Sequence, residues 1–470
     1  MTKQEGTNNT EEQQEINQKQ PIAAIATPVG EGGIAVIRVS GKNAIAKVNE
    51  AFEGQNLTDQ QSHTVHFGKI VDKEGNVVDE VLATLFHSPK SYTGEETVEI
   101  SCHGGVLVTQ AVLETMLALG ISSAEPGEFT QRAFLNGKME LSQAEAVADL
   151  IHAKSQKAMD AAHQQLEGQL GEHIKQFRQQ IIDATAMVEL ELDFVEEDVD
   201  FADKEELERL LKELDSEIDN LLATYETGRL VKHGVRTVFI GLPNAGKSTL
   251  LNTLVGKERA IVTDIAGTTR DTIDVDWSYD GLRFKLTDTA GLRDTEDVIE
   301  AEGVKRSQEA FEKADLAVYL KDLSKELTQE EREDIAQFQK SAGETPFVFI
   351  GTKNDIALDI EDERMDYDLK ISALEGEKID ELKKLMKQRA LENKAYDSSS
   401  LLVTSSRHRD ALQNAQKNVR SALKALDRGM TGDFLSIDLR SALKDLGTIT
   451  GEITTEDILD SIFSRFCIGK

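Results

Sequence analysis

The sequence predicts a multidomain α/β protein in which a doubly wound α/β domain follows a smaller α+β domain and interrupts a helical one. Three observations predict this. The chain has 470 residues, more than one hydrophobic core normally supports. Strand-like and helix-like runs alternate over 229–390, as in a doubly wound sheet. The segments on either side, 139–228 and 391–470, have helical periodicity and no strand-like runs. The simplest arrangement is therefore an α/β domain inserted into one discontinuous helical domain.

The composition narrows the class of protein. Residues 1–20 hold almost no apolar side chains, which predicts a disordered tail. No apolar run approaches the ~20 residues of a membrane span, and no signal-peptide pattern opens the chain. Cys102 and Cys467 give no disulfide framework, so we expect a cytoplasmic protein without a membrane partner. The formal charge of −32 opposes non-specific binding of nucleic acid, so a nucleic acid would need a local basic patch.

The short apolar runs within residues 21–138 predict the small α+β domain. Glu74–Asn76 is a hairpin signal between two apolar runs. Arg38 interrupts an apolar strand; an outward-facing strand position and an anion-binding clamp are equally good interpretations. The expected strands are Ile22–Ala26, Ile34–Val39, Val65–Val71, Val77–Phe86 and Val98–Ile100, and the expected helix is Val106–Leu119.

The helical flanks contain two charged segments. Leu141–Ile151 and Ala158–Ile181 have helical periodicity. Acids outnumber Lys and Arg by 15 to 3 over Glu189–Asp219, which indicates a solvated helix face. Arg407–Arg428 holds six Lys or Arg against two acids, so it is the best candidate for a basic patch.

A phosphate-binding loop lies at Gly241–Ser248, GLPNAGKS, which fits G-x-x-x-x-G-K-[ST] between the apolar run Val238–Ile240 and a helix. Backbone N–H groups and the helix N-terminus attract phosphates. Lys247 supplies a charge for the β- and γ-phosphates, and Ser248 is the expected Mg²⁺ ligand. The residues of this loop that we expect to bind nucleotide are Asn244, Ala245, Gly246, Lys247, Ser248 and Thr249.

Three sequence motifs after the phosphate loop favour GTP over ATP. Asp288–Gly291 fits D-x-x-G, in which the Asp bonds a Mg²⁺-bound water. Thr268-Thr269 stand where a switch threonine closes on Mg²⁺. Thr352–Asp355 resembles the guanine-reading pattern N-K-x-D. The expected contacts from these pieces and from the loop over the base are Thr269, Asp288, Thr289, Ala290, Gly291, Lys353, Asp355, Ser372 and Ala373.

Three residues depart from a generic GTPase. Thr352 replaces the Asn of the guanine pattern, so we expect the loss of an amide that ties loops together and a lower affinity for the base. Leu292 stands where small signalling GTPases have a water-orienting Gln, so another residue must orient the water. Asn244 could coordinate a monovalent cation beside the phosphates, or could be a turn residue that tolerates unusual dihedrals.

These motifs together resemble the tRNA-modification GTPase family MnmE, also called TrmE. The resemblance includes GLPNAGKS, IVTDIAGTTRD, DTAGLRD, TPVGEGGIAVIRVSG, YTGEETVEISCHGG, PGEFTQRAFLNGKMELSQAEAVADLI and the terminal FCIGK, and spans residues 21–470. It implies a folate-binding-like domain over 21–138 that binds a tetrahydrofolate derivative and forms a homodimer. It also implies a Ras-like GTPase domain over 229–390. The implied folate contacts are Arg38, Glu99, Lys138 and Lys470, while Cys467 is either reactive or a packed small residue.

The resemblance also implies ion-binding and catalytic roles. Potassium would be held by Asn244, Thr263, Ile265 and Thr268, and Thr263 would also contact GTP. Mg²⁺ would be held by Ser248 and by Thr269 or Thr268. Glu300 would orient the water after two GTPase domains meet, with Lys247 as the second catalytic residue.

The family acts with the flavoprotein MnmG (GidA) and tRNA. Together they add an aminomethyl or carboxymethylaminomethyl group to C5 of the wobble uridine, and GTP hydrolysis drives a conformational change through dimerisation of the GTPase domains. The partner could carry most tRNA contacts, with the Arg407–Arg428 helix assisting. Two alternatives are a GTP-switched ribosome-assembly or signalling module and a folate carrier with a vestigial GTPase. The folate-like domain argues against the first, and intact Lys247, Ser248 and Asp288 argue against the second.

Overall fold

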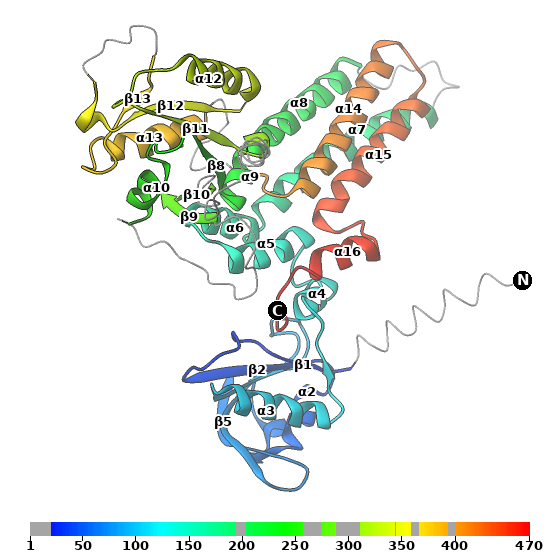
Figure 1. Cartoon of the computed structure of the whole chain (residues 1–470). Helices are drawn as coiled ribbons and strands as arrows, with labels where there is room; N and C mark the ends of the chain where they lie inside the picture. Colours follow the sequence, from blue (N-terminus) through cyan, green and yellow to red (C-terminus); the bar gives the residue numbers. More distant parts are fainter. Residues whose placement is uncertain are drawn as a thin grey trace, which may run out of the picture. The chain divides into compact units, whose positions relative to one another are not determined.

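The computed structural model describes residues 20–193, 204–256, 274–287, 311–343, 345–358, 366–392 and 401–470. The chain forms two compact units (Figure 1). The first comprises Met1–Ala148, Gln165–Lys175 and Leu446–Lys470, and the second comprises Asp149–Gln164 and Gln176–Asp445. Segments distant in sequence therefore share one unit.

The first unit contains a seven-stranded sheet in the order β3-β4-β5-β6-β2-β1-β7. Apolar side chains of its strands pack with α2 and α3 in one buried cluster that includes Ile37, Leu85, Ile100 and Met116. The elements are β1 (Ile22–Ile25), β2 (Ile34–Ser40), α2 (Ala44–Asn49), β3 (Phe52–Gly54), β4 (Thr64–Val71), β5 (Val77–Phe86), β6 (Thr97–His103), α3 (Val106–Ala118) and β7 (Ser122–Ser123).

The end of the chain returns to this unit. Helices α4 (Glu128–Leu135), α5 (Leu141–His152) and α16 (Glu456–Phe463) meet in a cluster that includes Leu141, Phe463 and Phe466. A Cβ on Gly127 would lie 2.7 Å from the Phe463 carbonyl oxygen, so the glycine permits the close approach of α16.

The second unit contains a six-stranded sheet in the order β13-β12-β11-β8-β10-β9, parallel except for β9. Alternate residues of β11 face opposite sides: Val318 packs in the cluster with α10 and α13, and Tyr319 packs in the cluster with α12. The sheet is therefore doubly wound. Its elements are β8 (Val235–Ile240), α10 (Lys247–Gly256), β9 (Asp274–Tyr279), β10 (Leu282–Thr287), β11 (Leu316–Asp322), α12 (Gln329–Ala342), β12 (Phe347–Thr352), η3 (Asn354–Ile356), β13 (Leu369–Lys370) and α13 (Ile379–Ala390).

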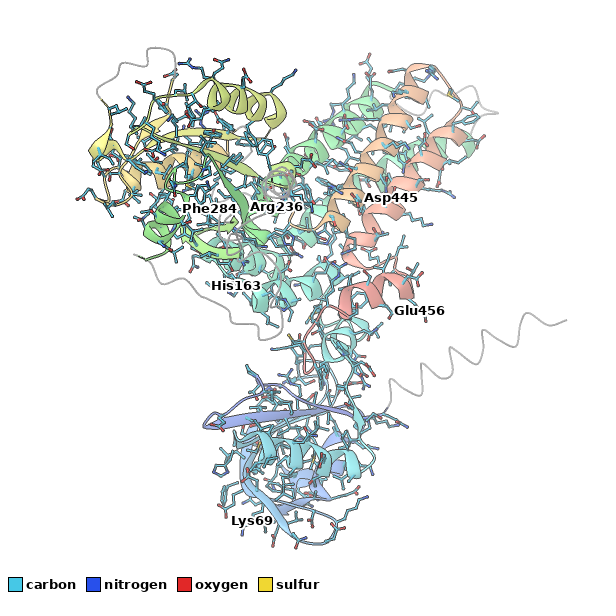
Figure 2. The ribbon with its side chains drawn as sticks, viewed as in Figure 1. Lys69, His163, Arg236, Phe284, Asp445 and Glu456 are labelled. Carbon is cyan, nitrogen blue, oxygen red and sulfur yellow. The ribbon has the colours of Figure 1, made fainter. Side chains whose placement is uncertain are left out.

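A tight turn at Asp280-Gly281 joins the antiparallel strands β9 and β10. The two residues have φ of 47° and 74°, the left-handed values of a tight hairpin turn. Phe284, labelled in Figure 2, pairs with Trp277 across β9 and β10 and is buried in the sheet core.

The remaining helices are α6 (Gln156–Leu166), α7 (Gln169–Asp193), α8 (Lys204–Ala223), α9 (Tyr225–His233), α14 (Ser406–Asp427) and α15 (Gly432–Thr450). Helices α8 and α14 lie side by side (Figure 1). The helical periodicity of Ala158–Ile181 is confirmed, but the stretch is divided between two helices. The chain breaks between α6 and α7, where Gly168 has a φ of 87° that helical residues do not adopt.

Candidate functional site

The phosphate loop connects β8 to α10. Gly241, Asn244 and Gly246 have φ of 142°, 65° and 91°. A Cβ on Gly241 would lie 2.3 Å from the Leu320 carbonyl oxygen, so this position accepts only glycine. The loop thus turns sharply and delivers the chain to the N-terminus of α10, where backbone N–H groups suit an anion.

Lys247 is buried within this loop. Its side chain reaches back, and its Nζ donates to the carbonyl oxygens of Gly241 (2.7 Å) and Leu242 (2.9 Å). The ammonium group therefore lies beside the loop backbone, where it can meet phosphate oxygens. Ser248 and Thr249 follow in the first turn of α10 and are exposed, and Ala245 is buried.

The base-reading residues follow β12, at the same end of the parallel sheet as the phosphate loop. Asp355 is exposed on η3, and the backbone N–H of Asn354 donates to the Ile371 carbonyl at 3.0 Å. Ser372 is fully buried. The Ala373 carbonyl accepts from the Thr253 hydroxyl of α10 at 2.9 Å. The segment that holds Ala373 therefore lies beside α10, and η3 lies beside that segment, at the strand ends where open α/β sheets bind ligands.

Thr352 links the phosphate loop to the end of β11 through its side chain. Its buried hydroxyl lies 2.8 Å from the Ala245 carbonyl oxygen and 3.0 Å from the Lys321 carbonyl oxygen. The phosphate loop and the base-reading segment are therefore tied together without the amide that the sequence pattern leads one to expect. The amide is absent, but the hydroxyl at this position reaches the same loop, and a lower affinity for the base stays a prediction.

Part of the predicted nucleotide and ion site lies outside the described residues: Thr263, Ile265, Thr268, Thr269, Asp288, Thr289, Ala290, Gly291, Leu292 and Glu300. The described part fits the implied ions. The Ser248 hydroxyl is exposed beside Lys247, and hydroxyl oxygen is a ligand that Mg²⁺ accepts. Asn244 has the left-handed backbone of a turn residue and an exposed amide, so the two interpretations of this residue are compatible.

A second cluster of predicted residues lies in the first unit. Arg38 and Glu99 are opposite each other in β2 and β6, and the Arg38 Nε and Nη2 donate to one Glu99 carboxylate oxygen at 3.0 and 2.8 Å. The guanidinium lies 5.4 Å from the centre of the Tyr92 ring and 5.7 Å from that of Phe129. Arg38 thus lies between a carboxylate of the next strand and two aromatic rings, and its role as an anion-binding clamp stays a prediction.

The C-terminal residues join this cluster. The Gly469 carbonyl accepts from Arg38 Nη1 at 3.4 Å, and Lys470 follows half-buried. Burial lowers the pKa of the Lys470 amine, and Arg38 lowers it further, while Glu99 acts in the opposite direction.

The other residues of this region have different surroundings. Lys138 is exposed and donates to the Pro89 carbonyl at 3.0 Å. The Cys467 side chain is exposed, so the idea that it is a packed small residue is wrong. Sequence patterns did not single out Tyr92 and Phe129. The available signal was an aromatic residue within an otherwise polar segment.

Two of the six basic residues of the expected patch Arg407–Arg428 form ion pairs with acids. Arg420 pairs with Asp215 of α8 at 2.7 Å. Arg409 pairs with Asp410 at 2.6 Å and lies over the Tyr225 ring. The acidic segment therefore compensates Arg420 of the basic helix, while the role of Arg407–Arg428 as a basic patch stays a prediction.

The doubly wound sheet, the glycine-dependent phosphate loop and the adjoining base-reading segment define a P-loop GTPase domain within a multidomain chain. Models of two families match: "MnmE helical domain" over residues 141–467 and "GTP-binding protein TrmE N-terminus" over residues 21–138. The chain is 48% identical to "tRNA modification GTPase MnmE" of Salinibacter ruber, over 97% of this chain and 100% of the relative. Relatives of the same name in Cytophaga hutchinsonii and Clostridioides difficile are 44% and 43% identical, over 97% and 96% of this chain and 98% and 99% of their own lengths. The chain therefore belongs to the MnmE family of tRNA modification GTPases.

Two further findings describe the chain. Within the described ranges, no helix combines the length and apolarity that crossing a membrane requires. Across the same ranges, no three His, Cys, Asp or Glu residues gather as a metal-binding group.

Among solved structures, the FeoB G-domain of Methanococcus jannaschii aligns over 33% of this chain and 97% of its own, at 21% identity and a TM-score of 0.25.

Proposed function

We propose that this chain is a potassium-stimulated GTP hydrolase that acts with an MnmG flavoprotein on tRNA. The pair adds an aminomethyl or carboxymethylaminomethyl group to C5 of the wobble uridine, with a tetrahydrofolate derivative as the one-carbon donor. The observation that carries this proposal is the phosphate loop with Lys247 buried against it, joined through Thr352 to the base-reading segment. Family membership supports the tRNA substrate.

The test of the whole proposal is analysis of wobble uridines in tRNA from cells that lack this chain. We expect the modified nucleoside to disappear and to return when the gene is restored. Normal modification would favour a GTP-switched assembly or signalling module instead.

In the GTPase part, Lys247 would bind the phosphates, Ser248 would hold Mg²⁺, Asn244 would hold the potassium ion, and Glu300 would orient the attacking water. When bound, the two ions would supply positive charge to the phosphate oxygens. The support from the described residues is the exposed Asn244 amide and Ser248 hydroxyl beside the buried Lys247.

The potassium ion and the Glu300 carboxylate can be tested by measuring GTP hydrolysis. Hydrolysis in KCl should exceed hydrolysis in NaCl, and Asn244→Ala should remove that difference while GDP binding persists. Glu300→Ala should lower the rate by about 10²-fold or more, the range of a lost general base. Equal rates in both salts would exclude the potassium role, and an unaffected Glu300→Ala would exclude the role of that carboxylate.

In the N-terminal part, Arg38, Glu99 and Lys470 bind the folate. A carboxylate accepts hydrogen bonds from the amino and ring N–H groups of a pterin, and the cations suit the carboxylates of a folate. The rings of Tyr92 and Phe129 beside Arg38 keep these groups in a partly apolar setting. Isothermal titration with 5-formyltetrahydrofolate checks this: Glu99→Gln should weaken binding, whereas Glu80→Gln, an exposed site on the same sheet, should not.

The same sheet supports the proposed homodimer. Val65, Phe67 and Leu82 are 57%, 66% and 45% exposed. Val65, Thr84, Glu99 and Arg38 lie opposite one another on the successive strands β4, β5, β6 and β2. Residues that are opposite each other in the register point to the same face, so the apolar side chains share a sheet face with Arg38 and Glu99. A second copy of this domain would cover the apolar side chains and border Arg38 and Glu99. Sedimentation analysis checks this: Phe67→Glu should yield monomers.

A further inference from the structure

Lys353 precedes the guanine-reading Asp355 and has an unusual backbone. Its φ is 58°, in the left-handed region that side chains with a Cβ rarely adopt. It is also the residue from which η3 begins, so its conformation sets the direction of the short helix that carries Asp355. A residue held in this region needs compensating contacts.

Asp322 supplies such a contact. It ends β11 directly opposite Thr352 in the sheet register, and its side chain is only 6% exposed. One carboxylate oxygen accepts from Lys353 Nζ at 2.7 Å. The other accepts from the Ser324 backbone N–H at 2.9 Å and from the Ser324 hydroxyl at 2.6 Å. The carboxylate is therefore fixed on both sides.

The charge of Asp322 is maintained by these contacts. Burial acts to raise the pKa of this carboxyl, but hydrogen bonds from Lys353 and Ser324 outweigh it, so its pKa lies below the usual value. The carboxylate is ionised at neutral pH, and its bond to Lys353 is charge-assisted.

The backbone beside Asp322 holds both ends of the base-reading segment. The Leu323 N–H donates to the Thr352 carbonyl at 3.0 Å, and the Leu358 N–H donates to the Leu323 carbonyl at 2.9 Å. Asp355 lies between these two attachments. The turn after β11 is thus the support on which the base-reading segment rests.

We infer that Asp322 is a positioning residue for guanine recognition: its ion pair with Lys353 aims Asp355 at the base. This inference rests on the proposed GTP binding and adds a residue that contacts no nucleotide itself. Asp355 is expected to accept hydrogen bonds from N1–H and from the 2-amino group of guanine. Inosine lacks the 2-amino group, so the preference for GDP over IDP measures how well Asp355 is aimed.

The experiment compares GDP, IDP and ADP affinities of the full chain by displacement of a fluorescent GDP analogue. Asp322→Asn should reduce the GDP-over-IDP ratio on the order of tenfold, the effect of one lost charge-assisted hydrogen bond. The matched control is Asp368→Asn. Asp368 is also a carboxylate of this domain that binds a backbone N–H and a cation, Phe349 N at 2.8 Å and Arg389 at 2.7 Å. That variant should keep the ratio.

A second pair of variants protects the test against misfolding. Lys353→Met removes the other half of the ion pair and should lower the ratio equally, and the double variant should lower it no further. A wild-type ratio in Asp322→Asn, or fully additive losses in the double variant, would overturn the positioning role. If the wild-type chain bound GDP no tighter than ADP, the proposed GTP function itself would fail, which is a distinct result.

Discussion

At the scale of single residues, Thr352 links two loops through one hydroxyl. Thr352→Val keeps the shape of the side chain but removes the group that lies between the carbonyls of Ala245 and Lys321. We expect GDP to bind several-fold more weakly. The free energy of unfolding should fall by about 1 kcal/mol, the usual net contribution of one hydrogen bond.

The control for this prediction is Thr352→Ser, which keeps the hydroxyl and should retain nearly all of the affinity. Stability can be followed by urea unfolding with Trp277 fluorescence, since the chain has one tryptophan and it is buried in this domain. Equal GDP affinities for the Val and Ser variants would show that the Thr352 hydroxyl does not contribute to GDP binding.

Asp315 makes stability depend on pH. Burial acts to raise its pKa, but hydrogen bonds from Arg236 and Arg229 outweigh this and hold the pKa at about 2 (Figure 2 labels Arg236). A lowered carboxyl pKa stabilises the fold above the unfolded pKa, and the contribution disappears as the pH falls from about 4 toward 2. The shift from 3.8 to about 2 corresponds to about 2 kcal/mol at neutral pH.

Asp315→Asn should therefore lower the free energy of unfolding by about 2 kcal/mol at pH 7, and the difference from wild type should shrink below pH 4. Urea titrations at several pH values with Trp277 fluorescence measure this. Glu381→Gln, at an exposed position of α13, serves as the control. A difference that does not change with pH would mean that the ion pairs are not its source.

At the scale of helices and strands, α8 shows how an acidic segment becomes a structural helix. Leu207, Leu211, Leu214, Ile218 and Leu221 recur at three- and four-residue spacing and are all buried, while the acids cover the remaining surface. The sequence interpretation of a solvated helix face is confirmed for the described residues 204–219.

Leu214→Ala should lower the free energy of unfolding by roughly 2–5 kcal/mol, because the side chain is fully buried and leaves a cavity. Leu210→Ala removes the same atoms from the same helix at a half-buried position outside the stripe, and should cost clearly less. Circular dichroism during urea unfolding measures both. Equal losses would indicate that helix propensity, rather than packing, stabilises α8.

Elements encoded by neighbouring residues could be predicted from the sequence. The phosphate loop, the hairpin at Glu74–Asn76 and the longer strands of both sheets depend on local patterns, and the structure contains them. The break at Gly168 could not be predicted, because apolar spacing continues on both sides of it. The contacts of Asp322 with Lys353 and of Tyr92 with Arg38 could not be predicted either, since they depend on strand order and on loops that fold far from their partners in sequence.

At the scale of the whole molecule, the last residues of the chain complete a cluster in the first compact unit. Gly469 has a φ of 94°, and a Cβ there would lie 2.3 Å from the Ile25 carbonyl oxygen. Only glycine allows the chain to pass β1 and to place Lys470 beside Arg38 and Glu99.

Gly469→Ala should therefore displace Lys470 and weaken 5-formyltetrahydrofolate binding by at least about tenfold, as should Lys470→Ala, since each removes one charged contact. Ile468→Ala changes an exposed neighbour and should leave binding intact. Basal GTP hydrolysis should be unchanged in all three, because the phosphate loop belongs to the other compact unit. Isothermal titration and a phosphate-release assay on the same preparations measure the two activities. Unaltered folate binding in Gly469→Ala would show that the C-terminal lysine takes no part in the site, while a parallel loss of hydrolysis would show that the two units do not act independently.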